Sequence, residues 1–208
     1  MKLRHAMVIP LFLALVPALP GGLTGQVKSV NRQIAEAVTI LPEAERAKAT
    51  VYGYRAGAKL ATIIRRGSNN FVCLADVPGD ERFQISCYHS GLDPFMALGR
   101  ELRAEGLEQT DVVQHRRRAI EAGTLVIPPN SVLYSYFGVG DINPTTGVPD
   151  SVAMLSVLYV PGATVESTGL PERPGATGEP WLMQSGMHRA HIMIGGLRKA
   201  FEVAQSSN

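Results

Sequence analysis

The chain has 208 residues, of which 45% are hydrophobic and 18% are charged, and its formal net charge is +2. This length suits a single domain with a sizeable buried core. So small a net charge gives no electrostatic reason to expect nucleic acid or an anionic membrane as a partner.

Residues 1–25 have the layout of a secretory signal peptide. Lys2 and Arg4 supply a basic start, an apolar run covers residues 6–19, and small residues close the segment. The run is shorter than the ~20 apolar residues that a membrane span needs, and no later stretch is apolar enough for one. Removing the segment takes away two basic residues and no acid, so the net charge falls from +2 to 0. We predict a secreted or periplasmic protein whose mature part, residues 26–208, is one domain without an integral membrane span.

The first half of the mature chain is predicted to contain two helices and then strands. Ser29 is a good cap for a helix that continues to Leu41, and residues 42–48 form a second short helical turn. Four runs rich in β-prone residues follow, separated by turn residues, which predicts an antiparallel meander. These runs cover residues 50–55, 59–66, 71–77 and 82–89.

The last two of these strands form a hairpin around the strong turn signal at residues 78–81. Setting Val77 opposite Phe83 places the odd-numbered, mostly apolar residues on one face and sets Cys73 opposite Cys87. Directly opposed strand positions lie about 4.5–5.5 Å apart at Cα, within reach of a disulfide. Because disulfides persist in exported proteins, we predict a bond between these cysteines. Two buried free thiols are the alternative.

The second half predicts inserted helices and further strands. Asp93 caps a helix that ends before Gly106, and a second helix covers residues 111–122. Residues 161–179 form a long loop of the kind that is often functional or mobile. The fold class is therefore α+β, an antiparallel sheet with an inserted helical hairpin and flanking helices. The remaining strands are predicted at residues 124–127, 132–137, 152–160, 181–183 and 190–194, before a final helix at residues 197–205.

Three histidines are candidate metal ligands. His188 and His191 are three residues apart, so on a helix both imidazoles would share one face and could bind a metal. On a strand the same spacing places them on opposite faces. His89, at the end of the hairpin's apolar face, is a further candidate. Polar or packed histidines without a metal are the alternative, since the chain has no HExxH motif and too few cysteines for a zinc ribbon.

Five arginines are candidate ligands for an anion. Two precede a Gly-Ser-Asn-Asn turn whose amides could join them in binding a carboxylate or phosphate. The other three form the only dense basic run, for which the alternative is a solvated helix face with an ion pair between Arg117 and Glu121. The five candidates are Arg65, Arg66, Arg116, Arg117 and Arg118.

The sequence contains no motif that assigns a catalytic activity or a cofactor. Ser185 lacks the leading glycine of the G-x-S-x-G elbow. The glycines at 138 and 140 lack the third glycine and the following helix of a dinucleotide fingerprint. We therefore expect no cofactor.

Three segments, GSNNFVCL (67–74), CYH (87–89) and PWLMQSGMHRAHIMI (180–194), resemble segments of an uncharacterised family of secreted bacterial proteins. The resemblance extends over about residues 40–195 and implies export and a shared arrangement of these segments, but no activity, ligand or partner. The sequence thus favours an exported, soluble, non-catalytic domain that binds a ligand or partner. The alternative is a periplasmic metal-binding protein or metal-dependent hydrolase that uses the three histidines.

Overall fold

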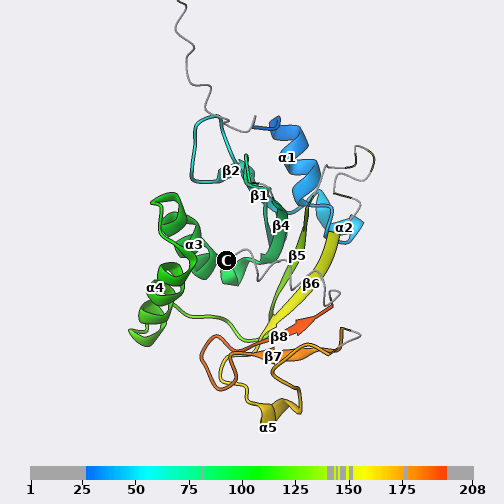
Figure 1. Cartoon of the computed structure of the whole chain (residues 1–208). Coiled ribbons are helices and arrows are strands. Elements are labelled where there is room, and N and C mark those ends of the chain that lie inside the picture. The colour runs from blue at the N-terminus through cyan, green and yellow to red at the C-terminus, as the bar shows by residue number, and fades with distance from the viewer. Residues whose placement is uncertain are drawn as a thin grey trace, which may run out of the picture.

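The computed structural model describes residues 27–80, 82–139, 152–175 and 178–195, together with residues 143, 145 and 149. The predicted signal peptide and the predicted final helix lie outside these residues. Within them the chain forms a single eight-stranded sheet with helices on both faces (Figure 1). Among the helices so described, none has the length and apolar character to cross a membrane.

The sheet is mixed, and its strand order is β2-β1-β3-β4-β5-β6-β8-β7. Neighbouring strands are antiparallel except for the parallel pair β1 and β3. All the strands predicted after residue 131 are present, and each end lies within two residues of its predicted position. The strands are β1 Thr50–Gly53, β2 Thr62–Arg65, β3 Phe71–Leu74, β4 Arg82–His89, β5 Ser131–Val139, β6 Val152–Tyr159, β7 Trp181–Met183 and β8 His191–Ile194.

The predicted antiparallel meander is wrong at one connection, because β3 lies beside β1 and not beside β2. The turn after β2 explains the difference. The backbone N–H groups of Ser68 and Asn69 donate to the carbonyl oxygen of Lys48, just before β1. A Cβ atom on Gly67 would lie 2.2 Å from that oxygen, so only glycine permits this approach. The chain therefore crosses the start of β1 and continues on its far side.

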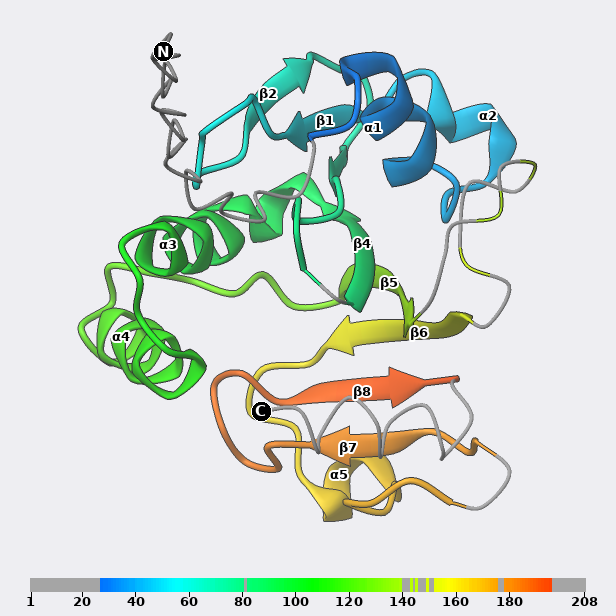
Figure 2. The same cartoon turned by 45° about the horizontal axis from the view of Figure 1, so that its top comes forward.

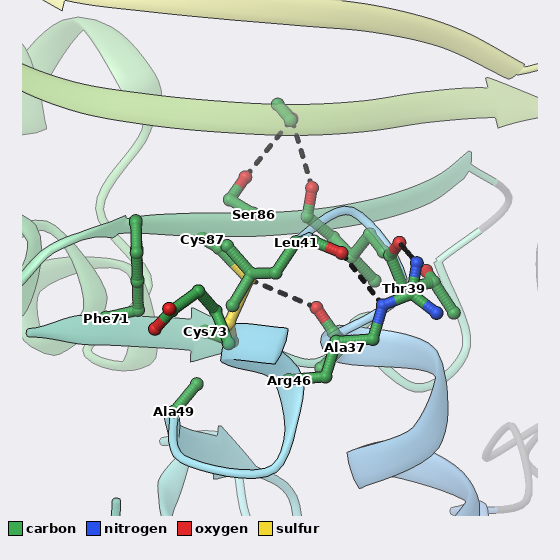
Figure 3. Close-up of a disulfide and its surroundings, with 12 residues drawn as sticks. Ala37, Thr39, Leu41, Arg46, Ala49, Phe71, Cys73, Ser86 and Cys87 are labelled. Atoms are coloured by element: carbon green, nitrogen blue, oxygen red, sulfur yellow. Dashed lines mark hydrogen bonds between the residues drawn. A yellow bond between two sulfur atoms is a disulfide. The ribbon is translucent and has the colours of Figure 1, made fainter. Parts of the chain in front are cut away.

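The predicted hairpin register and disulfide are both present. Phe71 pairs with His89 and Cys73 with Cys87, and a disulfide joins the cysteines, whose Cα atoms are 4.0 Å apart. Both cysteines are completely buried. Figure 3 shows that the disulfide lies next to the segment that contains Ala37. The carbonyl oxygen of Ala37 is 3.2 Å from the Cys87 sulfur.

A hydrophobic core covers each face of the sheet. The helix α1 (Val30–Ala37) and the residues after it pack against the disulfide-bearing face, next to the short helix α2 (Glu43–Arg46). The side-chain pattern predicts a polar second face for the hairpin, with Val72 and Leu74 as exceptions. Instead, that face packs a second core in which Tyr88 is completely buried.

The second core is completed by two consecutive helices that contact each other, α3 (Asp93–Ala104) and α4 (Gln109–Glu121). They follow the 3-10 turn η1 (Ser90–Leu92), and Figure 2 shows them on the opposite side of the sheet from α1. Residues 124–127, predicted to be a strand, form no strand but bury Leu125 and Ile127. The long loop after β6 contains the short helix α5 (Val165–Thr168).

Candidate functional site

The candidate site lies where α3 and α4 meet the β6–β8 end of the sheet. In Figures 1 and 2 the loop between β7 and β8 passes beside α4. Side chains from α3, α4, β6, β8 and this loop gather there, and most of them are aromatic or basic. We call this group the Tyr159 cluster; it consists of Phe95, Arg116, Tyr159, His188, Arg189 and His191.

Arg116 is the buried cation of the cluster, with only 8% of its surface exposed. Its guanidinium carbon lies 4.1 Å from the centre of the Phe95 ring. Gly99, one helical turn after Phe95, makes room for the group, because a Cβ atom there would lie 2.0 Å from Nη2 of Arg116. Burial, assisted by the positive charge of Arg103, lowers the pKa of Arg116 to about 10. The side chain therefore remains a cation at neutral pH.

Three nitrogen atoms of the Tyr159 cluster are buried without a hydrogen-bond partner. They are Nε of Arg116, Nε2 of His188 and Nε of Arg189, and no other described side chain has such an atom. Leaving a buried donor unpaired costs about 1–3 kcal/mol, and more when the group is charged. Unpaired buried groups are rare in native proteins. One of the three atoms lies on α4, and the other two belong to consecutive residues of the loop between β7 and β8.

No carboxylate among the described residues forms an ion pair with Arg116 or Arg189. The acid that follows Arg116 on the same helix, Glu121, is exposed and is paired with Arg117 at 2.7 Å. The Arg117 hydrogen bond lowers the pKa of Glu121, and the charge of His188 contributes in the same direction. The cluster thus has an excess of positive charge.

Tyr159 connects the two halves of the cluster. Its ring centre lies 6.0 Å from that of Phe95 and 5.4 Å from that of His191. Burial raises the pKa of Tyr159, while the positive charges of Arg116 and Arg189 both act to lower it. Both arginines therefore act electrostatically on this hydroxyl.

His191 is held in its uncharged form. Its Nδ1–H donates to the carbonyl oxygen of Arg189 at 2.8 Å. Burial lowers the pKa of His191, and the charge of Arg189 acts in the same direction.

The depressed pKa of His191 predicts a pH-dependent stability. The unfolded chain binds more protons than the folded chain at pH values between the lowered pKa and the ordinary value of 6.5. The free energy of unfolding is therefore expected to fall as the pH drops below about 6.5. Urea unfolding at pH 7.5, 6.5 and 5.5 should show this slope, and His191→Gln should reduce it. His115→Gln, at an exposed position on α4, should leave the slope unchanged; equal slopes in all three proteins would contradict the prediction.

A second polar group adjoins the cluster but is internally satisfied. The hydroxyl of Tyr88 donates to Asp93 at 2.7 Å, and Arg100 donates to Tyr88 at 2.6 Å and to Asp93 at 3.0 Å. Arg100 also lies over the Tyr52 ring, 4.4 Å from its centre. The prediction that Asp93 caps its helix is wrong, since α3 has no side-chain cap. Because Arg100 holds Asp93, this carboxylate is not the counter-ion of Arg116.

The structure does not bring the five candidate arginines together. Arg116 alone belongs to the Tyr159 cluster, and its neighbours Arg117 and Arg118 are exposed. Arg65 and Arg66 lie at β2, which Figures 1 and 2 show well away from α4. The guanidinium of Arg65 donates to the carbonyl oxygens of residues 49 and 46. Its hydrogen bonds therefore stabilise the backbone of the segment before β1.

The three candidate histidines do not form a metal site. Within the part of the chain that the structure describes, no three His, Cys, Asp or Glu side chains are grouped so that they could hold a metal ion. His89 shares the face of β4 with Cys87, whereas His191 stacks on Tyr159 on the opposite face of the sheet. Nδ1 of His89 instead accepts a hydrogen bond from the backbone N–H of Gly91. The His89 side chain thus caps the start of the turn η1.

The sequence identifies Arg116, His188 and His191 as candidate residues, but it does not predict that they lie with Phe95, Tyr159 and Arg189. One available signal was that Arg116 follows Val112 by four residues, so it lies on the buried face of α4. The contributions of Phe95, Tyr159 and Arg189 depend on packing between distant segments.

Scans of protein-family models, curated proteins and solved structures found no match to this chain.

Proposed function

We propose that the mature chain is an exported, non-catalytic binding protein whose ligand carries a negative charge and binds at the Tyr159 cluster. Export is favoured by the leader-like sequence of residues 1–25 and by the disulfide between Cys73 and Cys87. Binding is favoured by the character of the cluster, which consists of basic side chains and aromatic rings.

The observation that carries the proposal is the buried Nε of Arg116, which has no hydrogen-bond partner and belongs to a guanidinium without an ion pair to any described carboxylate. Removing a charged group from water costs several kcal/mol unless a partner offsets the loss. Stacking on Phe95 offsets part of this cost, since a desolvated cation–π contact contributes about 2 kcal/mol. A bound anion would offset the rest of this cost.

The test replaces Arg116 with methionine, which retains much of the side-chain volume and removes the charge. Thermal unfolding of the mature protein is measured with increasing sodium acetate, with sodium chloride at matched ionic strength as the reference. The wild type is expected to gain stability from the carboxylate, by about 2.7 kcal/mol at a concentration one hundred times Kd. Arg116→Met should be at least as stable as the wild type without the anion, because an apolar residue replaces an unpaired buried charge, and it should not respond to the anion.

Arg118→Met is the matched control, because Arg118 lies on the same helix and is exposed. This variant should keep the full response. An equal response of wild type and Arg116→Met would place any anion binding elsewhere and contradict the proposal.

A further inference from the structure

We infer that the ligand of the Tyr159 cluster is a monocarboxylate attached to an apolar body. This inference rests on the proposed function and narrows it, because it separates an organic acid from inorganic phosphate or sulfate. It follows from the charge of the cluster, from the shape of its donors and from the apolar side chains around it.

The fixed charge at the site suits a monoanion. Arg116 is the one cation of the cluster that is more than nine-tenths buried. Arg189 is only partly buried, and its Nη2 already donates to the side-chain oxygen of Gln184 at 3.1 Å. His191 contributes no charge at neutral pH, since burial lowers its pKa. A dianion would therefore retain much of its desolvation cost at this place, whereas a single negative charge is matched by Arg116.

The donor geometry suits a planar acceptor. The N–H bonds of a guanidinium lie in one plane, and a carboxylate presents two oxygens in a matching plane. The Phe95 ring lies over the guanidinium of Arg116, and the gap at Gly99 receives its Nη2. These contacts hold the group in position from α3, so its orientation is fixed before a ligand arrives.

The surroundings suit an apolar body. Three methionines, from α3, β7 and β8, pack against the same core as Phe95 and Tyr159 and retain some exposed surface. Methionine is flexible and polarizable, and it forms surfaces that adapt to apolar ligands of varied shape. Met183 pairs with His191 across the β7–β8 ladder, so one of them adjoins the cluster directly. The three are Met96, Met183 and Met193.

The test compares four compounds on the mature protein by isothermal titration calorimetry at constant ionic strength: hexanoate, acetate, hexanamide and inorganic phosphate. Hexanoate is expected to bind at least about tenfold more tightly than acetate, because its extra methylenes become buried. Hexanamide, which has the same body without the charge, should not bind measurably. Arg116→Met should lose hexanoate binding. Met183→Gln should reduce the difference between hexanoate and acetate but leave acetate binding intact.

The outcomes separate this inference from the broader proposal. Phosphate that binds as tightly as hexanoate through Arg116 would overturn the carboxylate assignment and leave anion binding in place. Equal binding of hexanamide and hexanoate would show an apolar site without charge recognition and would also overturn the inference. If none of the anions binds, both the inference and the proposed function fall.

Discussion

Replacing both Cys73 and Cys87 with alanine is expected to lower the free energy of unfolding by about 3 kcal/mol. The two residues are 14 positions apart, so the bond closes a loop that the unfolded chain would otherwise leave unrestrained. The bond also joins β3 to β4 in the interior of the sheet, where both cysteines are fully buried and pack with Ala37 of α1 (Figure 3). In a domain of this size the loss corresponds to a fall of about 6–12 °C in Tm.

Urea unfolding of the double variant and the wild type measures this effect. Dithiothreitol provides the control: it should not reduce the wild type under native conditions, because the sulfur atoms are inaccessible, and should reduce it once urea has unfolded the chain. A double variant as stable as the wild type would show that the bond contributes nothing to the fold.

Gln33→Met is the second substitution with a large expected effect, a loss of about 2–4 kcal/mol. The Gln33 side chain is buried and binds both backbone groups of Tyr54, accepting from its N–H at 2.7 Å and donating to its carbonyl at 2.9 Å. It also donates to the carbonyl of Lys28 at 2.8 Å. Methionine would fill the same volume and leave these groups unpaired, at about 1–3 kcal/mol for each that stays buried.

Asn31→Met is the matched control, since Asn31 is an exposed residue of the same helix. It should change the free energy of unfolding by less than about 0.5 kcal/mol. Chemical denaturation of the two variants measures their free energies of unfolding. If Gln33→Met is as stable as Asn31→Met, the role assigned to Gln33 is wrong.

The central hairpin could be predicted because its information is local. The alternation of side chains has a period of two, so a single register makes one face of residues 71–89 apolar and aligns Cys73 with Cys87. The turn residues between the strands point to the same register. By contrast, the pairing of β1 with β3 depends on the approach of Gly67 to the backbone before β1, and nothing near Gly67 in the sequence indicates that distant contact.

The docking of α1 is predicted by periodicity only in part. The apolar pattern predicts that Val30, Ile34, Val38 and Leu41 face the core. Val38 and Leu41 are buried and Ile34 packs against the core, but Val30 is 40% exposed. The polar residues Gln33 and Glu36 are buried as well, and Glu36 pairs with Lys28 at 2.7 Å and with Arg32. Polar contacts with other segments thus bury two residues that the apolar pattern leaves out.

The candidate site could be predicted only in part for the same reason. The dense basic run drew attention to Arg116, but its neighbours Arg117 and Arg118 point to solvent, because consecutive residues of a helix face different directions. The partners that make Arg116 notable, Phe95 and Tyr159, come from other elements of the fold. A sequence pattern identifies the charge; packing determines that the charge is buried and unpaired.

The Nε–H signal of Arg116 in the nuclear magnetic resonance spectrum of ¹⁵N-labelled mature protein tests the central claim most directly. Comparison with Arg116→Met assigns the signal, and hexanoate is then added at constant ionic strength. Anion binding at the Tyr159 cluster predicts that this signal shifts to saturation and that its proton exchanges more slowly with water. If the Arg116 signal stays unchanged while the compound reaches high concentration, the guanidinium is a packed side chain and has no part in binding.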